Sequence, residues 1–222
     1  MRIALLGGTG DLGEGLALRL AAHTNHDVVI GSRDPDAAHD AADDYQATLS
    51  ARGHEGKITG FENGMAAERA DVVVLAVPPY TVSDTVDAVA DGLASGDVIV
   101  TPAAGMRRED GGFHAHLPAA GSVTALVAEA APDGVPVVGA FHSLPADRLA
   151  DLDADLGIDT LLVGDDERAK RVVSGIVDDV DGLRALDAGG LANAAEVESL
   201  TPLLLNVASE NDGLRDLGVS FR

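Results

Sequence analysis

Short apolar runs of strand length recur along the first two thirds of the chain. They cover residues 2–6, 27–32, 72–77, 98–101 and 136–141, and helical patterns lie between most of them. The runs are nearly continuous stretches of Val, Ile, Leu and Ala, which are typical of strands covered on both faces. The pattern therefore predicts an α/β fold with a doubly wound, mostly parallel sheet and right-handed crossovers.

Helices are expected between these strands. The first covers residues 12–23, a second begins at Pro35 behind the cap Asp34, and Asn63 caps a short third one that ends at Arg69. The alternation of strands and helices supports parallel pairing, because parallel strands need a crossover connection between them.

The pattern changes after residue 141. It predicts a strand over 160–163, a helix over 166–179, a short strand over 184–186 and a long apolar helix from Leu191 onward. A chain of 222 residues is too short for two full domains. We therefore expect a larger domain over residues 1–141 and a small C-terminal α/β domain over residues 142–222.

The first predicted strand runs into a glycine-rich turn. Residues 7–13 read Gly-Gly-Thr-Gly-Asp-Leu-Gly and open the first helix. Gly8 would allow a tight turn, Gly10 would let the backbone approach a pyrophosphate, and Gly13 would let the helix pack on the strand. Strand, glycines, helix and second strand fall within about thirty residues, which indicates a Rossmann-type dinucleotide-binding unit. Its expected cofactor contacts are Gly8, Thr9, Gly10, Asp11, Leu12 and Gly13.

The end of the second strand indicates which dinucleotide is bound. An NAD-binding protein normally places an acid there for the ribose 2′-hydroxyl, but this chain has Ser32 and Arg33. These side chains suit a 2′-phosphate, and one charge-assisted contact favours NADP by about ten- to a hundredfold. Asp34 and Asp36 add negative charge nearby, although a helix start favours acids in any case. Val77 and Pro78 stand at the end of the strand over 72–77, where they would either contact the nicotinamide ribose or only end the strand.

The charge of the chain limits the classes of partner that it can bind. The 37 acidic residues outnumber the 15 basic ones, giving a net charge of −22, so binding to nucleic acid is not expected. Acid enrichment along the whole chain with only two lysines suggests a halophilic source, because such a surface stays soluble in concentrated salt. No run approaches the twenty apolar residues of a membrane span, so a cytoplasmic protein is expected.

Metal and thiol chemistry have little support in the sequence. There is no cysteine, and His114 and His116 lie in a glycine-rich stretch without a third ligand in view, so no metal site is predicted. No Ser-His-Asp order, Walker loop or HExxH motif is present either, so no motif supports a hydrolase or kinase function.

Several motifs together resemble those of the archaeal F420-dependent NADP reductases. They are the glycine loop 7–13, Gly-Ser-Arg at 31–33, Ala-Phe-His-Ser-Leu-Pro-Ala at 140–146, Leu-Asp-Ala-Gly at 186–189, Glu-Ser-Leu-Thr-Pro-Leu at 198–203, and the closing Leu-Gly-Val-x-Phe at 217–221. The resemblance implies a Rossmann domain that binds NADP and a small C-terminal domain that helps to close a cleft. In that cleft the deazaflavin coenzyme F420 would stack on the nicotinamide.

The resemblance also implies roles for individual residues. Residues 9–12, Ser32, Arg33 and Ala146 would lie on NADP, and His142, Ser199, Thr201 and Leu217 would lie near the deazaflavin. The chain departs from the family at Asp36 and Ala37, where members commonly have a second basic residue, and at the acids Asp11 and Glu14 of the glycine loop.

The implied activity is reversible hydride transfer between NADP(H) and F420, which needs positioning and a dry site more than acid–base chemistry. His142, Ser199 and Thr201 are suitable types to steady charge on the deazaflavin, and His142 is the candidate catalytic residue. Ser199 and Thr201 could equally only cap or bend the helix ahead of Pro202, and a His after a strand is often structural.

Three alternative functions stay open at this point. They are an NADPH-dependent imine or keto-acid reductase, a non-enzymatic NADP-sensing protein, and a ferric reductase module, which usually comes with a membrane part. The apolar helix after Leu191 suggests a homodimer interface, although burial within its own subunit would explain the same pattern.

Overall fold

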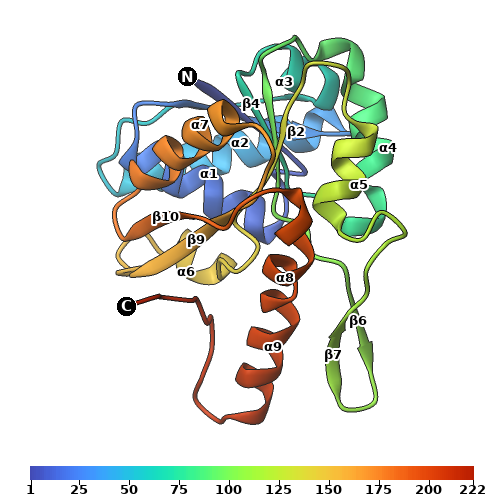
Figure 1. The fold of residues 1–222 in the computed structure, drawn as a ribbon. Helices are drawn as coiled ribbons and strands as arrows, with labels where there is room; N and C mark the ends of the chain where they lie inside the picture. The colour runs from blue at the N-terminus through green and yellow to red at the C-terminus, as the bar shows by residue number, and fades with distance from the viewer.

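The computed structural model describes all 222 residues and has a six-stranded parallel sheet at its centre (Figure 1). The strands are β1 (Arg2–Leu6), β2 (Asp27–Ser32), β3 (Ile58–Glu62), β4 (Val72–Leu75), β5 (Val98–Thr101) and β8 (Val137–Gly139). Their order across the sheet is β3-β2-β1-β4-β5-β8, and every neighbouring pair is parallel. The predicted doubly wound Rossmann-type sheet is confirmed.

Helices cover both faces of this sheet, as the continuous apolar runs predict. They are α1 (Asp11–His23), α2 (Pro35–Ala51), α3 (Asn63–Glu68), α4 (Val82–Val89) and α5 (Val123–Ala130), with short 3-10 turns η1 (Pro79–Thr81) and η2 (Ala90–Gly92). Successive strand residues point to opposite faces. Leu5 accordingly packs with residues of α1 and α2, whereas Leu6 packs with residues of α3, α4 and α5.

The C-terminal part adds a smaller α/β unit. It contains α6 (Ala146–Ala150), β9 (Ile158–Leu162), α7 (Glu167–Asp178) and β10 (Leu183–Asp187), and the two strands pair in parallel. Leu149 and Leu162 belong to the same hydrophobic cluster as Leu5. The C-terminal part therefore shares a core with the large sheet.

The long apolar helix expected from Leu191 is divided in the structure. It consists of the 3-10 turn η3 (Leu191–Asn193), α8 (Ala194–Glu198) and α9 (Leu200–Glu210), with Ser199 between the two α-helices. Pro202 has no N–H to donate to the carbonyl four residues earlier, so a continuous helix loses a hydrogen bond at this place.

Other boundaries also differ from the expectation. The third and fifth predicted strands are shorter, and Phe141 has a φ of 68°, which ends the extended backbone after β8. Asn63 is the first residue of α3, and the side chain that caps this helix is Glu62, which accepts from the Gly64 N–H. Strand β3 was not predicted, because its five residues carry only a short alternating pattern.

The structure also contains an unpredicted antiparallel hairpin of β6 (Met106–Glu109) and β7 (Gly112–Ala115). It runs alongside α9 and projects from the body with it (Figure 1). Asn206 of α9 joins the two elements, because its amide bonds both the N–H and the carbonyl of Phe113 at 2.7 Å. His114 thus lies in a strand instead of a loop, and no three His, Asp or Glu side chains gather closely enough to hold a metal ion.

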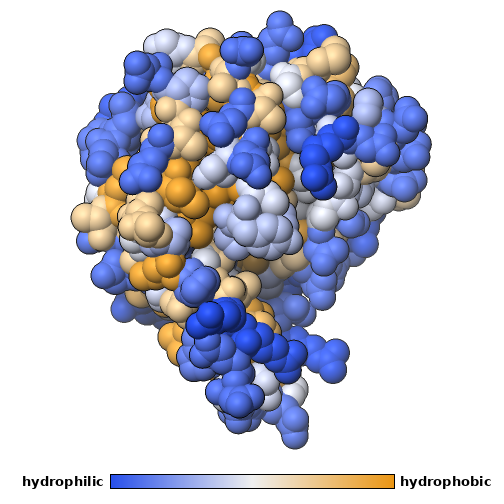
Figure 2. Space-filling model, turned by 90° about the vertical axis from the view of Figure 1, so that its right-hand side faces the viewer, coloured by the Kyte–Doolittle hydropathy of each residue, from blue (hydrophilic) through white to orange (hydrophobic).

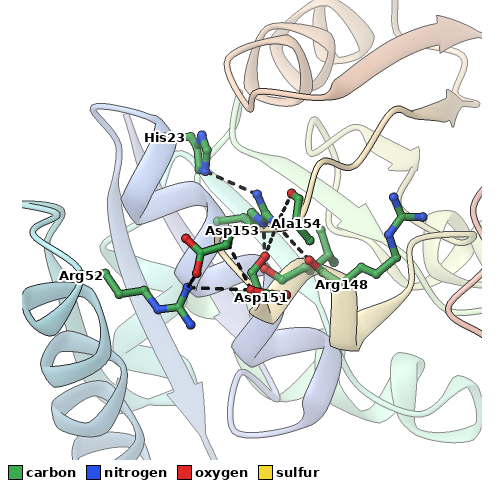
Figure 3. A network of polar contacts seen from close by, with 8 residues as sticks. His23, Arg52, Arg148, Asp151, Asp153 and Ala154 are labelled. Atoms are coloured by element: carbon green, nitrogen blue, oxygen red, sulfur yellow. Dashed lines mark hydrogen bonds and ion pairs between the residues drawn. The ribbon is translucent and has the colours of Figure 1, made fainter.

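Arg19 joins α1 to the C-terminal part. Its side chain is 2% exposed, and its guanidinium donates to the carbonyls of Leu149, Arg148 and Ala154, each at 2.9 Å, and to that of Asp151. Figure 3 shows this network, with the exposed ion pair of Arg52 and Asp153 beside it. The guanidinium therefore satisfies carbonyls at the end of α6 that have no partner within that helix.

Glu198 makes a second connection of this kind. The side chain comes from the end of α8 and is 1% exposed. Its carboxylate accepts from the N–H groups of Val123 and Thr124, at 2.9 and 2.8 Å, and from the Thr124 hydroxyl at 2.8 Å. Burial raises the pKa of Glu198, while these hydrogen bonds act in the opposite direction. A buried carboxylate at the start of α5 also suits the positive end of that helix.

Candidate active site

The carboxyl ends of β1, β2 and β4 surround an open cleft of about 550 Å³. The strand order reverses here, and doubly wound sheets bind their ligands at such a point. The lining consists of Gly7, Thr9, Gly10, Ser32, Arg33, Asn63, Ala76, Val77, Pro78, Tyr80, Thr81, Asp84, Thr85 and Ala88. Six of the predicted cofactor contacts are in this set: Thr9, Gly10, Ser32, Arg33, Val77 and Pro78.

The glycine loop closes one side of the cleft. Gly7 has a φ of 77° and is the left-handed residue of the turn, and a Cβ on Gly8 would lie 2.7 Å from the Leu5 carbonyl oxygen. The N–H groups of Gly7 and Gly8 donate to the Gly31 carbonyl at 3.0 and 3.3 Å, which ties the end of β1 to β2. A Cβ on Gly13 would lie 2.5 Å from the Gly8 Cα, whereas a Cβ on Gly10 would meet nothing closer than 3.6 Å. Gly13 is thus required for packing, and Gly10 leaves the backbone accessible.

The N-terminus of α1 faces the same cleft. Its cap residue is Gly10, and no side chain bonds the N–H groups of the first turn. These groups are free to donate to an anion such as a pyrophosphate. Gly8, Asp11, Leu12 and Gly13 do not line the cleft themselves, and Leu12 packs against the core beneath the loop.

Ser32 and Arg33 leave β2 at the far side of the cleft. The Asp34 N–H donates to the Ser32 oxygen at 3.2 Å, so the Ser32 hydroxyl remains able to donate its own proton. The Asp34 carboxylate accepts from the Asp36 N–H at 3.0 Å as the cap of α2. Arg33 is exposed and takes part in no ion pair. The acid that follows Arg33 therefore stabilises a helix start and leaves the guanidinium available.

A second pocket of about 290 Å³ lies between α6, α9 and the C-terminal segment. It is lined by His142, Ser143, Leu144, Pro145, Ala146, Asp147, Thr201, Leu204, Leu205, Ala208, Asp216 and Leu217, half of them hydrophobic. The Thr201 hydroxyl donates to the His142 carbonyl at 2.7 Å, which fixes α9 against the segment after β8. The pocket thus combines an apolar wall with a few polar groups, as sites for small ring systems do.

Close packing of α6 on α1 places this pocket beside α1. A Cβ on Gly15 of α1 would lie 2.9 Å from the Ala146 carbonyl and 2.7 Å from the Leu149 Cβ. Ala146 in turn lines the second pocket. The helix whose N-terminus faces the first cleft therefore also forms the support of the second.

Comparison with known proteins identifies the family of this chain. Residues 2–105 match the protein-family model described as NADP oxidoreductase, coenzyme F420-dependent. The F420-dependent NADP reductase of Methanocaldococcus jannaschii is 39% identical over 218 residues, 96% of each chain. That of Methanothermobacter marburgensis is 36% identical over 223 residues, 99% of this chain and 97% of the relative. The chain belongs to the F420-dependent NADP reductase family.

Solved structures agree on the fold. A putative F420-dependent NADP reductase from Arthrobacter aligns with a TM-score of 0.79 at 23% identity, covering 100% of this chain and 99% of the other. A hypothetical protein from Sinorhizobium meliloti aligns with a TM-score of 0.68 at 28% identity, covering 87% and 86%. None of the helices in this family member is long and apolar enough to cross a membrane.

Most but not all of the predicted contact residues in the C-terminal part line the second pocket. His142, Thr201 and Leu217 line the second pocket, together with Ala146, which the family resemblance had implied for NADP. Ser199 lines neither pocket, and its hydroxyl donates to the Ala195 carbonyl of α8 at 2.6 Å. Its observed contact is thus that of a residue at a helix junction.

Sequence reasoning missed several residues of both pockets. Asn63, Thr81, Asp84, Thr85 and Ala88 line the first cleft, and Leu204, Leu205, Ala208 and Asp216 line the second. Most of those in the first cleft follow strands β3 and β4. A prediction of β3 from the sequence would also have indicated Asn63, because the residue after a parallel strand lies at the ligand-binding edge of the sheet.

His142 differs from the other lining residues. Both of its ring nitrogens are buried without a hydrogen-bond partner, and its Cε1 lies 3.0 Å from where a Cβ on Gly139 would be. Burial lowers its pKa to about 4, so the imidazole is neutral at pH 7. The backbone carbonyl of His142 receives the Thr201 hydroxyl, while the ring lies in the interior.

This burial predicts a pH dependence of stability. The unfolded imidazole binds a proton near pH 6.5, whereas the folded one does so only near pH 4, so stability is lost as the pH falls between these values. We expect the free energy of unfolding to fall by about 2 kcal/mol more in the native protein than in His142→Gln between pH 7 and pH 5. Urea unfolding at both pH values measures this difference. Equal losses in the two proteins would contradict the burial of a neutral ring.

Proposed function

We propose that the protein transfers a hydride reversibly between NADP(H) and the deazaflavin coenzyme F420. The observation that carries the proposal is the pair Ser32 and Arg33. The hydroxyl proton of Ser32 and the guanidinium of Arg33 have no acceptor in the protein, and both residues face the uncapped start of α1 across one cleft. This set of donors suits a dinucleotide with a 2′-phosphate. Family membership at 39% identity over the chain supports the deazaflavin as the other substrate.

The chain itself supplies positioning in this reaction. Backbone N–H groups of the glycine loop and α1 would bind the pyrophosphate, and Val77 and Pro78 would pack against the nicotinamide ribose. The nicotinamide and the deazaflavin bring the reacting atoms, and the protein holds the rings face to face and excludes water.

We also propose that the second pocket takes the deazaflavin. His142, Thr201 and Leu217 line it, and Ala146 lies where this pocket adjoins α1. The neutral His142 ring offers no charge at pH 7, so its proposed contribution is steric and through hydrogen bonding. On this basis residues 1–141 would act as the NADP-binding domain, and residues 142–222 would close the deazaflavin cleft. Ser199 would support Thr201 from the helix junction.

Quaternary structure and source form a further part of the proposal. Leu203 and Val207 of α9 are 55% and 37% exposed and lie one helical turn apart, and this apolar surface would pair two chains into a cytoplasmic homodimer. Hydrophilic side chains cover most of the outline of the face in Figure 2, in keeping with the net charge of −22 and a halophilic archaeal source.

Light scattering in molar salt should give the mass of two chains, and dialysis to low salt should unfold them. A single-chain mass would exclude the dimer.

The function is tested by mixing NADPH with oxidised F420 and purified protein in high-salt buffer. We expect the deazaflavin absorbance band to bleach with NADPH and to bleach much more slowly with NADH. The reverse reaction, with reduced F420 and NADP⁺, should restore the band.

The same assay separates the alternatives. No bleaching together with tight NADPH binding would overturn the proposal. Turnover of a small imine or keto acid would then identify a reductase of another class, and binding without any oxidation would identify a sensor.

A further inference from the structure

Asn63 is the most unusual polar side chain of the nucleotide cleft. It is the first residue of α3, directly after β3, and is only 8% exposed. Its Oδ1 is buried without any hydrogen-bond partner in the protein. Buried polar atoms are rarely left unpaired, because the lost contacts with water are not replaced. Asn63 is nevertheless one of the residues that line the cleft, so a ligand bound there would lie against it.

The position of this carboxamide is defined by its neighbours. The Asn63 Oδ1 lies 2.9 Å from where a Cβ on Gly31 would be, beside Leu6 and Ala66. Gly31 precedes Ser32, and Ser32 pairs with Glu62 in the register of β2 and β3. Asn63 therefore lies at the same corner of the cleft as the proposed 2′-phosphate contacts Ser32 and Arg33. A larger residue at position 31 would collide with the amide.

The chemistry of the atom indicates which part of a ligand it meets. An amide oxygen accepts hydrogen bonds, whereas a phosphate dianion has no proton to donate. A hydroxyl of the adenosine ribose does have one, and it adjoins the 2′-phosphate. No acid stands at the end of β2 to accept from this ribose, since Ser32 and Arg33 occupy that place.

We propose that the Asn63 carboxamide accepts a hydrogen bond from the adenosine ribose of NADP(H) and so positions the nucleotide. This inference rests on the proposed function only in taking NADP(H) as the ligand. An uncharged acceptor at this place binds the ribose without repelling the neighbouring 2′-phosphate, which an aspartate would do.

The test measures the affinities of NADPH and NADH in the absence of F420. We expect Asn63→Ala to weaken both nucleotides by about threefold to tenfold, because both carry the ribose. Asn63→Asp keeps the acceptor but adds a charge, so it should weaken NADPH at least as much and NADH clearly less. Asn193→Ala is the matched control, since this exposed amide bonds only the Ala188 carbonyl and lies outside the cleft.

A purely structural role would give a different result. Asn63→Ala would then change the melting temperature and weaken neither nucleotide, and Asn63→Asp would leave the ratio of NADPH to NADH affinity unaltered. Either result would overturn the inference. A second measurement needs no variant: the side-chain amide NMR signals of Asn63 should shift when adenosine 2′,5′-bisphosphate is added to the native protein. Absence of that shift despite binding would also reject it. If the native protein does not bind NADPH, the proposed function itself fails.

Discussion

Replacement of Arg19 by methionine is expected to lower the free energy of unfolding by about 3 to 5 kcal/mol. Methionine keeps much of the packing of the aliphatic stem, so the loss reports mainly on the guanidinium. Four backbone carbonyls of residues 148–154 would each lose the guanidinium as a donor in a buried or partly buried place, and α6 would lose its attachment to α1. Urea unfolding followed by circular dichroism measures the change.

Arg52→Met provides the matched control. Arg52 lies in the same network, but its ion pairs with Asp151 and Asp153 are largely exposed to solvent (Figure 3). Such pairs contribute little, and high salt weakens them further, so this variant should lose less than about 1 kcal/mol. Losses of similar size in the two variants would show that Arg19 does not hold the two parts of the chain together.

Replacement of Arg33 by alanine is expected to weaken NADPH binding by about ten- to a hundredfold and to leave NADH binding unchanged. The guanidinium has no partner within the protein and stands at the edge of the cleft beside Ser32. It is thus free to pair with the 2′-phosphate, which NADH lacks. Titration of each nucleotide by fluorescence or calorimetry in molar salt gives the two affinities.

The control for this experiment removes the same charge elsewhere. Arg171 is an exposed arginine of α7 that forms no ion pair, and Arg171→Ala should change neither affinity. High salt makes this comparison informative, because screening removes long-range attraction and leaves direct contacts. A parallel loss of NADPH and NADH affinity in Arg33→Ala would assign Arg33 to the general shape of the cleft.

The central sheet was predictable because its signals are local. Val72, Val73 and Val74 form one unbroken apolar run, and such runs are typical of strands buried on both faces. The glycine loop was predictable for the same reason: its strand, glycines and helix are consecutive. Ser32 and Arg33 followed from their place after β2, because parallel strands put their carboxyl ends at one edge.

Features with weak or ambiguous local patterns escaped prediction. Strand β3 is short and only partly buried, and the hairpin of β6 and β7 is almost fully exposed, so neither carries a strong apolar period. The apolar pattern around Ser199 is continuous and predicts a single helix, and only Pro202 indicates the junction between α8 and α9. Asn63 was assigned as a cap from its residue type, whereas its place in the cleft depends on β3 pairing with β2.

The sequence by itself thus determined the Rossmann-type sheet and placed the glycine loop, Ser32 and Arg33 at the carboxyl edge of that sheet, since each depends on neighbours along the chain. The tertiary structure decided how the C-terminal part is joined to that sheet. Arg19 reaches carbonyls some 130 residues away, and Glu198 caps a helix that begins about 75 residues before it. It also decided that the His142 ring is buried and neutral, because burial and hydrogen-bond partners come from elements that meet only in the folded chain.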